Sequence, residues 1–266
     1  PDSFDGGLSN YLFKVASEVI SYGHEPIVIV SSFENNCFEY EGISVYRVNP
    51  KRTLIYKAAD KLSRFKIQVV LDVLLQSYCL NKKLKEIDKT NKIDIVQFPS
   101  YKAISLFAPK NIVSVLRLSG YQKLWDEANG IHNKKFKDKI YQKIEDYTLK
   151  KAQHIFGPSE FLANVINEKF NKKVTIIETP YQNNKIKLNL DIVNDINKKT
   201  NGNKYLLFFG RIALFKGAID IADILKPLLS KYPNLYIVII GKDVGFKNEK
   251  SMNYIYNKVG DYKDRV

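Results

Sequence analysis

The chain contains 266 residues, enough for one large or two ordinary domains, and its 45% hydrophobic and 12% aromatic content is typical of a globular protein with a substantial core. No apolar run approaches the roughly 18 residues that a membrane-spanning helix needs. The two cysteines, Cys37 and Cys79, have neither the spacing of a metal site nor that of a disulfide framework, which indicates a cytoplasmic protein.

The formal net charge is +14, and residues 51–151 carry most of the excess, with 22 Lys and Arg against 10 Asp and Glu. Within this segment a helix is expected over residues 53–80, with Lys57, Lys61 and Arg64 along one side. Such a basic segment can attract nucleic acid or the anionic inner leaflet of a membrane. It can equally be a solvated face that reflects the lysine-rich habit of an AT-rich genome.

The first predicted element is a helix. Gly6 and Gly7 end a turn-like start, and an amphipathic pattern runs from Leu8 until Gly23 closes the helix. Beyond it the pattern predicts strands at residues 27–32, 43–48, 93–98, 111–118 and 154–157, and helices at 53–80, at 134–151 and from Ser159 onward.

Polar residues lie at or near the carboxyl ends of two of these strands. Gln97 is in strand 93–98, while Arg117 and Ser119 are at the end of strand 111–118. In an open α/β sheet, ligands bind outside the carboxyl ends of the strands. These three side chains are therefore candidates for a cleft, although Arg117 can also serve as a structural ion-pair partner.

Residues 182–203 are polar and rich in Asn and Lys, which indicates an interdomain hinge and the lead-in to the second domain. We therefore expect two domains, residues 1–181 and residues 182–266.

The second domain opens with the sequence KYLLFFGRIALFKG. The apolar run Tyr205–Phe209 predicts a strand buried on both faces, followed at once by Gly210 and Arg211. Lys216 and Gly217 then precede a helix that contains Pro227, which is expected to kink it. Two cations around a loop that enters a helix favour an anion, above all a diphosphate, but such a loop can also be solvated with incidental charges. The next strand is expected over residues 235–240, and Gly241 at its carboxyl end is a further candidate for the cleft. A helix is expected at 251–259.

Four stretches together resemble family 4 of the GT-B glycosyltransferases, the retaining glycosyl transferases group 1. They are GG…GHE near the start, PSE…F, VTIIETPY, and FFGRIALFKG…LLSKYPNLYIVIIGKD. The resemblance implies an α/β fold in which two Rossmann-like domains face each other across a cleft. It also implies transfer of a sugar, of the hexosyltransferase type, from a nucleoside-diphosphate donor to a saccharide or lipid-linked saccharide in cell-envelope polysaccharide synthesis.

The resemblance assigns residues as well. It implies that the donor diphosphate binds to Gly6, Gly7, Gly210, Arg211, Lys216 and Gly217. We expect Arg211 and Lys216 to be catalytic, because they would stabilise the charge that develops on the departing diphosphate. No metal or other cofactor is expected, since the sequence has no Asp-x-Asp pair or His cluster suited to one.

The chain also departs from the family. Many members place a histidine at the end of one of the two strands that here carry Gln97 and the Arg117/Ser119 pair. The resemblance further implies that the first strand and the later acidic motif are lacking, so we expect an incomplete enzyme that is inactive by itself.

Two other functions remain open at this point. A nucleotide-sugar 2-epimerase of the same fold would also bind a diphosphate, but it needs cleft carboxylates and a histidine, which the sequence does not identify. A basic nucleic-acid-binding module has less support, because the aromatic residues lie in apolar runs and do not alternate with basic ones.

Overall fold

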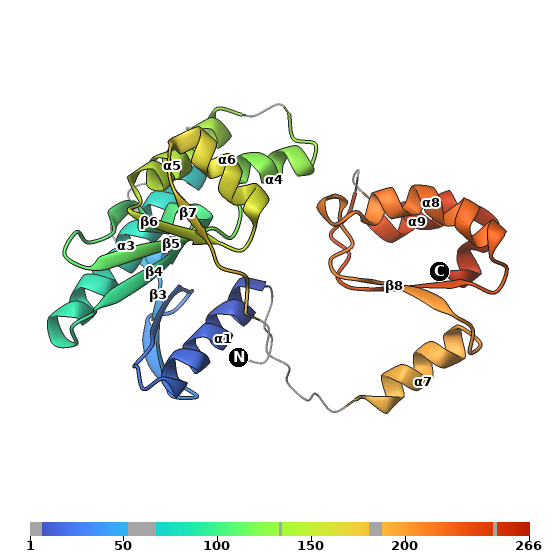
Figure 1. Cartoon of the computed structure of the whole chain (residues 1–266), viewed down its shortest axis with the longest axis horizontal. Coiled ribbons are helices and arrows are strands. Elements are labelled where there is room, and N and C mark those ends of the chain that lie inside the picture. The colour runs from blue at the N-terminus through green and yellow to red at the C-terminus, as the bar shows by residue number, and fades with distance from the viewer. Residues whose placement is uncertain (1–6, 53–67, 133–134, 181–187, 247–248) are drawn as a thin grey trace. The chain divides into compact units, whose positions relative to one another are not determined.

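The computed structural model describes residues 7–52, 68–132, 135–180, 188–246 and 249–266 (Figure 1). The chain forms two compact units, of which unit 1 contains residues 1–124 and 132–183 and unit 2 contains residues 125–131 and 184–266. The boundary expected between residues 181 and 182 lies outside the described residues. No helix in the described ranges combines the length and apolar character that a bilayer crossing requires.

The elements of unit 1 follow the order expected of an α/β fold. They are α1 (Gly7–Ser21), β1 (Ile27–Ser31), β2 (Asn36–Tyr40), β3 (Ile43–Val48), α3 (Gln68–Thr90), β4 (Ile95–Pro99), the 3-10 segment η3 (Tyr101–Phe107), β5 (Val113–Arg117), α5 (Phe136–Lys151), β6 (His154–Gly157), α6 (Glu160–Phe170) and β7 (Val174–Ile176). The short helix α4 (Gln122–Ala128) contains residues of both units.

The described residues of unit 1 form two sheets. The first has the order β1-β3-β2, with β1 parallel and β2 antiparallel to β3, and the second is the parallel sheet β4-β5-β6-β7. Strand β2 was not predicted. It forms a hairpin with β3 through a two-residue turn, Glu41 and Gly42, whose φ angles of 49° and 78° suit the right-handed twist of paired strands.

Helix α3 also differs from the prediction, because it continues to Thr90 rather than ending at Leu80. Leu84 and Ile87 prolong its buried face, with exposed fractions of 4% and 6%. The basic side chains Lys57, Lys61 and Arg64, expected on one side of this helix, lie outside the described residues.

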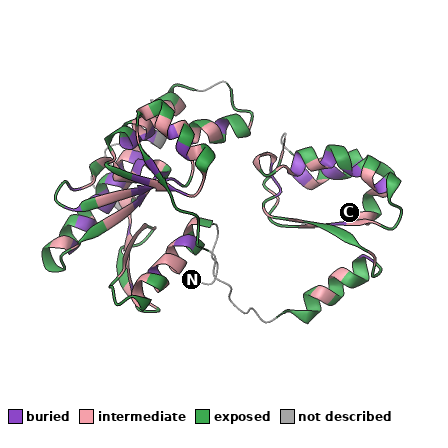
Figure 2. Cartoon of the chain, in the orientation of Figure 1, coloured by how far each residue is buried: buried purple, intermediate pink, exposed green. Residues whose placement is uncertain are grey.

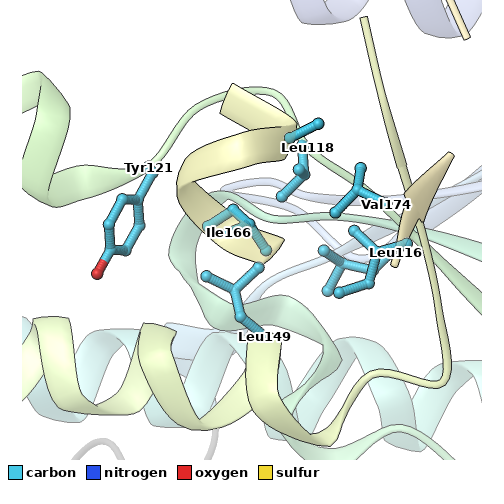
Figure 3. Packing of buried hydrophobic residues seen from close by; sticks show 8 residues of the cluster. Leu116, Leu118, Tyr121, Leu149, Ile166 and Val174 are labelled. Atoms are coloured by element: carbon cyan, nitrogen blue, oxygen red, sulfur yellow. The ribbon is translucent and has the colours of Figure 1, made fainter. Parts of the chain in front are cut away.

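Buried residues of β5, α5, α6 and β7 form the main core of unit 1 (Figure 3). The labelled members are Leu116, Leu118, Tyr121, Leu149, Ile166 and Val174. Phe98 of β4 and Leu116 of β5 belong to buried clusters on one face of the sheet, and successive side chains of a strand point to opposite faces. Gln97 and Arg117 therefore lie on the other face of the sheet, where Tyr11 of α1 contacts both.

In its described residues, unit 2 contains a two-stranded parallel sheet and its helices. The elements are α7 (Leu190–Lys199), β8 (Tyr205–Phe209), the 3-10 turn η4 (Leu214–Lys216), α8 (Ala218–Lys231), β9 (Tyr236–Ile240), α9 (Ser251–Val259) and the 3-10 segment η5 (Gly260–Arg265). Helix α8 continues through Pro227 as one element, so the proline does not end it. The core of unit 2 joins β9 to α8 and α9 through Leu225, Leu229, Ile237, Ile255 and Val259.

Unit 2 departs from the expected elements in two places. The segment 182–203, expected to be a hinge, contains α7, which begins where the side chain of Asn189 accepts hydrogen bonds from the amides of Asp191 and Ile192. Strand β8 is not buried on both faces, since Leu207 and Phe209 are 54% and 80% exposed (Figure 2). Within the described part of the chain, β8 pairs only with β9 and packs against helices only on the side of Phe208.

Candidate functional site

The loop that follows β8 is joined to the loop that follows β9 by backbone hydrogen bonds. The amide of Gly210 donates to the Ile240 carbonyl at 2.9 Å, and the amide of Ile212 donates to the Lys242 carbonyl at 3.0 Å. The amide of Val244 then donates to the Ile212 carbonyl at 3.3 Å. The parallel ladder therefore continues past the ends of both strands and holds the two loops side by side.

This close contact explains Gly241, and the turn into α8 explains Gly217. A Cβ at Gly241 would lie 1.7 Å from the carbonyl oxygen of Gly210, so no other residue fits there without moving the loops. Gly217 has a φ of 74° and donates its amide to Leu214 at 2.9 Å, which closes η4 before α8 begins. The chain can therefore turn sharply from the loop into the helix.

Three cations surround these loops, and all three are exposed: Arg211, Lys216 and Lys242. None forms an ion pair with a carboxylate in the described ranges. The nearby Ile212 and Ala213 are only 4% and 1% exposed, and Ile212 joins the loop to the core of unit 2. The cations thus project from a fixed backbone at the carboxyl edge of the sheet.

The N-terminus of α8 adds its partial positive charge to this edge. Asp220, in the first turn of the helix, is the one acidic residue there. A phosphate group beside Arg211 and Lys216 would meet two positive side chains and the helix amides, against the carboxylate of Asp220; the carboxylate of Asp243 on the adjacent loop accepts hydrogen bonds from three backbone amides. The arrangement can hold a dianion outside the ends of β8 and β9.

The loop after β9 also carries a helix cap that the sequence analysis did not identify. Asp243 accepts hydrogen bonds from the amides of Gly245, Ser251 and Met252 at 2.9, 3.0 and 3.0 Å. Burial raises the pKa of Asp243, but these amides outweigh it and hold the pKa below its ordinary value. The carboxylate therefore fixes the start of α9 behind the loop that contains Gly241.

In unit 1, Arg117 is buried without an acidic partner. It is 7% exposed, and its guanidinium carbon lies 3.6 Å from the ring centroid of Tyr11. Its Nη2 donates to Oγ1 of Thr179 at 3.2 Å, and no carboxylate contacts it among the residues described. Burial lowers the pKa of Arg117, and the Tyr11 ring and hydroxyl partly compensate. Arg117 is therefore held by a cation–π contact and not by the ion pair that was the alternative.

The other two cleft candidates of unit 1 are close to Arg117. The hydroxyl of Tyr11 donates to Oε1 of Gln97 at 3.2 Å, which places Gln97 in the same group of contacts. Ser119 is exposed, and its amide donates to Oγ of the buried Ser100 at 3.1 Å. The structure thus brings Gln97, Arg117 and Ser119 together along the ends of β4 and β5.

The glycines expected near the donor in unit 1 are less informative. Gly6 lies outside the described residues. Gly7 begins α1, and a Cβ there would meet nothing within 4 Å, so the local structure does not require glycine at this position.

Unit 1 also contains a hollow of about 760 Å³ that the sequence analysis did not identify. It lies between β2 and β3 on one side and α3 on the other, and its lining includes Arg47, Lys82 and Lys83. These cations were not expected to share a surface, because β2 was not predicted. Among the described side chains, His, Cys, Asp and Glu form no group of three that could hold a metal ion.

Comparison with known proteins supports the fold. No family model matches the sequence, and no curated protein matches it. The structure is similar to a sucrose-phosphate synthase from Thermosynechococcus elongatus, with a TM-score of 0.65 at 12% sequence identity. The match covers 98% of this chain, and the chain spans 64% of the length of that structure. The α/β fold class, of the GT-B kind that the sequence indicated, is therefore confirmed.

Proposed function

We propose that this protein is a glycosyltransferase that moves a sugar from a nucleoside-diphosphate donor to a saccharide or lipid-linked saccharide. The observation that carries the proposal is the fixed loop Gly210–Gly217, which presents Arg211 and Lys216 at the carboxyl edge of its sheet. The likeness in fold to a sucrose-phosphate synthase supports it.

The chemistry follows from the charge that develops during transfer. The bond between the anomeric carbon and the donor diphosphate breaks, an acceptor hydroxyl forms the new bond at that carbon, and the hydroxyl proton passes to an oxygen of the departing diphosphate. Arg211, Lys216 and the first amides of α8 would stabilise the negative charge on the diphosphate where it develops. This role needs no metal ion. We infer retention at the anomeric carbon and membership of family 4 from the motif resemblance alone.

The acceptor side rests on unit 1. Gln97, Arg117 and Ser119 lie along the ends of β4 and β5, where ligands of open α/β sheets bind. We infer that this edge receives the acceptor, and that the setting is synthesis of a cell-envelope polysaccharide.

A thermal-shift screen of the protein against UDP, GDP, CDP, dTDP and ADP tests the donor. A ligand at 100 times its Kd should raise the free energy of unfolding by about 2.7 kcal/mol. We expect one of the five diphosphates to stabilise the protein well above the rest. No response to any of them would contradict the proposal. A protein that interconverts a nucleotide sugar without any acceptor would instead be an epimerase.

We further infer that the protein is cytoplasmic and binds the inner face of the cell membrane through charge. The excess of 22 basic over 10 acidic residues in positions 51–151 supports this, because each basic residue near an anionic surface contributes about 1 kcal/mol. In co-sedimentation with vesicles, binding should need anionic lipid and should fall as salt rises. Equal binding to neutral and anionic vesicles would show that the basic residues form a solvated surface and do not bind the membrane.

A further inference from the structure

The chain takes an unusual conformation directly after β4. Lys102 and Ala103 both have left-handed backbone angles, with φ of 55° and 48°. Residues with a Cβ rarely adopt this region, and two in succession are held there only by their surroundings. The segment lies at the carboxyl edge of the sheet, next to the candidate acceptor residues.

Buried polar side chains hold this segment in place. The carbonyl of Ile104 accepts hydrogen bonds from Ser77 Oγ at 2.8 Å and from Asn81 Nδ2 at 2.7 Å. Ser77 and Asn81 are on α3 and are 0% and 1% exposed. The amide of Lys102 donates to the hydroxyl of Tyr141, on α5, at 3.2 Å. Side chains of α3 and α5 therefore hold the backbone in the left-handed turn.

The turn leaves Tyr101 exposed and Lys102 partly exposed. Tyr101 is 50% exposed, and Nζ of Lys102 lies 5.2 Å from the centroid of its ring. The preceding residue, Ser100, accepts from the amide of Ser119 at 3.1 Å, so the turn lies beside the end of β5. An aromatic face and an ammonium group are therefore displayed together at the edge where β4 and β5 end.

We propose that Tyr101 and Lys102 form a subsite for an acceptor saccharide that carries a negative charge. The proposal rests on the glycosyltransferase function proposed above and names the class of its acceptor. The Tyr101 ring offers a flat surface for a sugar, and Lys102 offers a cation for a phosphate or carboxylate on it. The buried Arg117 has no carboxylate partner among the described residues, and its charge makes the same edge favourable for an anion.

Three probes distinguish the possible sources of the charge. Farnesyl-diphospho-N-acetylglucosamine carries phosphate, methyl glucuronide carries a carboxylate, and octyl N-acetylglucosaminide carries no charge. We expect the full chain to bind at least one charged probe about tenfold more tightly than the neutral one in a calorimetric titration. Lys102→Gln should remove this preference, and Tyr101→Ala should weaken both classes, each by roughly tenfold, which corresponds to about 1.4 kcal/mol.

A control separates binding from backbone strain. Lys102→Gly and Glu41→Gly each relieve a left-handed residue and should raise the stability, since Glu41 has a φ of 49°. Only Lys102→Gly should reduce binding of the charged probe. Failure of every probe to bind, or unchanged probe affinity in both Tyr101→Ala and Lys102→Gln, overturns the subsite. The response to nucleoside diphosphates, measured separately, decides whether the proposed function still holds.

Discussion

The carbonyl oxygen of Gly210 occupies the space that a Cβ at Gly241 would need, since the two would lie only 1.7 Å apart. This contact closes the edge of the sheet in unit 2, because the Gly210 amide also bonds to the residue before Gly241. The position of Arg211 therefore depends on a glycine 30 residues away along the chain.

We predict that Gly241→Ala separates the two loops. Overpacking of a close contact typically costs about 1–3 kcal/mol, and this contact involves backbone on both sides. The free energy of unfolding measured in urea should fall by about 1–3 kcal/mol or more. Nucleoside-diphosphate binding should weaken in the same variant. Gly120→Ala is the matched control, because a Cβ at Gly120 would meet nothing within 4 Å. Equal stability of the two variants would contradict this account.

Much of the fold was predictable because its signals are local. The apolar runs of β3 and β9 and the capped helix α6 were predicted close to their observed bounds. Strand β2 was missed because its sequence, NCFEY, mixes polar with apolar residues at the edge of a sheet. The dipeptide Glu41-Gly42 between two alternating runs was the signal that could have identified the hairpin. Helix α7 was missed because it is rich in Asn, Asp and Lys and has no buried residue.

The candidate site also has features that local sequence predicts and features that depend on distant residues. The loop with Arg211 and Lys216 could be predicted because its glycines and cations are adjacent in sequence. The contact of Arg117 with Tyr11 could not, since it joins an early helix to a strand more than 100 residues later. The left-handed turn at Lys102 is likewise imposed by side chains of two distant helices and not by its own sequence.

We predict that Asp243 contributes stability that is lost in acid. Its pKa in the folded chain is below the ordinary value of 3.8, so the unfolded chain binds the proton first as pH falls. The contribution is fully present above about pH 5 and declines as pH falls through 3.8 toward the lower folded pKa. Asp243→Asn should cost about 1 kcal/mol at pH 7, as loss of a helix cap does.

Unfolding by urea at several pH values between 3 and 7 measures this dependence. The difference between the parent protein and Asp243→Asn should shrink toward low pH. Asp191→Asn serves as a control, because Asp191 is an exposed carboxylate in the first turn of α7. A difference that stays constant with pH would show that Asp243 acts through packing alone.

We predict that Arg117 and Tyr11 are energetically coupled. A double-mutant cycle with Arg117→Met and Tyr11→Leu should give a coupling of about 1–2 kcal/mol, because the pair is buried and desolvated. Arg47 and Phe38 form a comparison pair that is less buried and wider, at 4.8 Å from the guanidinium carbon to the ring centroid. That pair should give no more than about 0.5–1 kcal/mol. A larger coupling energy in the Arg47–Phe38 pair would contradict the claim that burial strengthens the contact between Arg117 and Tyr11.

Our last prediction concerns the two cations of the loop after β8. Arg211→Ala and Lys216→Ala should each weaken nucleoside-diphosphate binding by about 1.5–3 kcal/mol, the range for hydrogen bonds to charged groups. Arg211→Lys should recover only part of the loss, because lysine cannot bind a phosphate in the bidentate manner of arginine. Lys226→Ala is a suitable control, since Lys226 is an exposed cation farther along α8 and changes the net charge equally.

Salt dependence strengthens this test. If the cations acted only through general electrostatic attraction, which added salt screens, all three alanine variants would lose nucleotide affinity to a similar small extent. A specific diphosphate-binding site instead predicts that Lys226→Ala binds the nucleotide as the parent protein does at every salt concentration. Arg211→Ala and Lys216→Ala should bind it weakly at every salt concentration. Stability of the loop variants should stay close to that of the parent, because both side chains are exposed and the loop is held by Ile212 and Ala213. Parent-like nucleotide affinity in both loop variants, with the fold intact, would remove the basis of the proposed function.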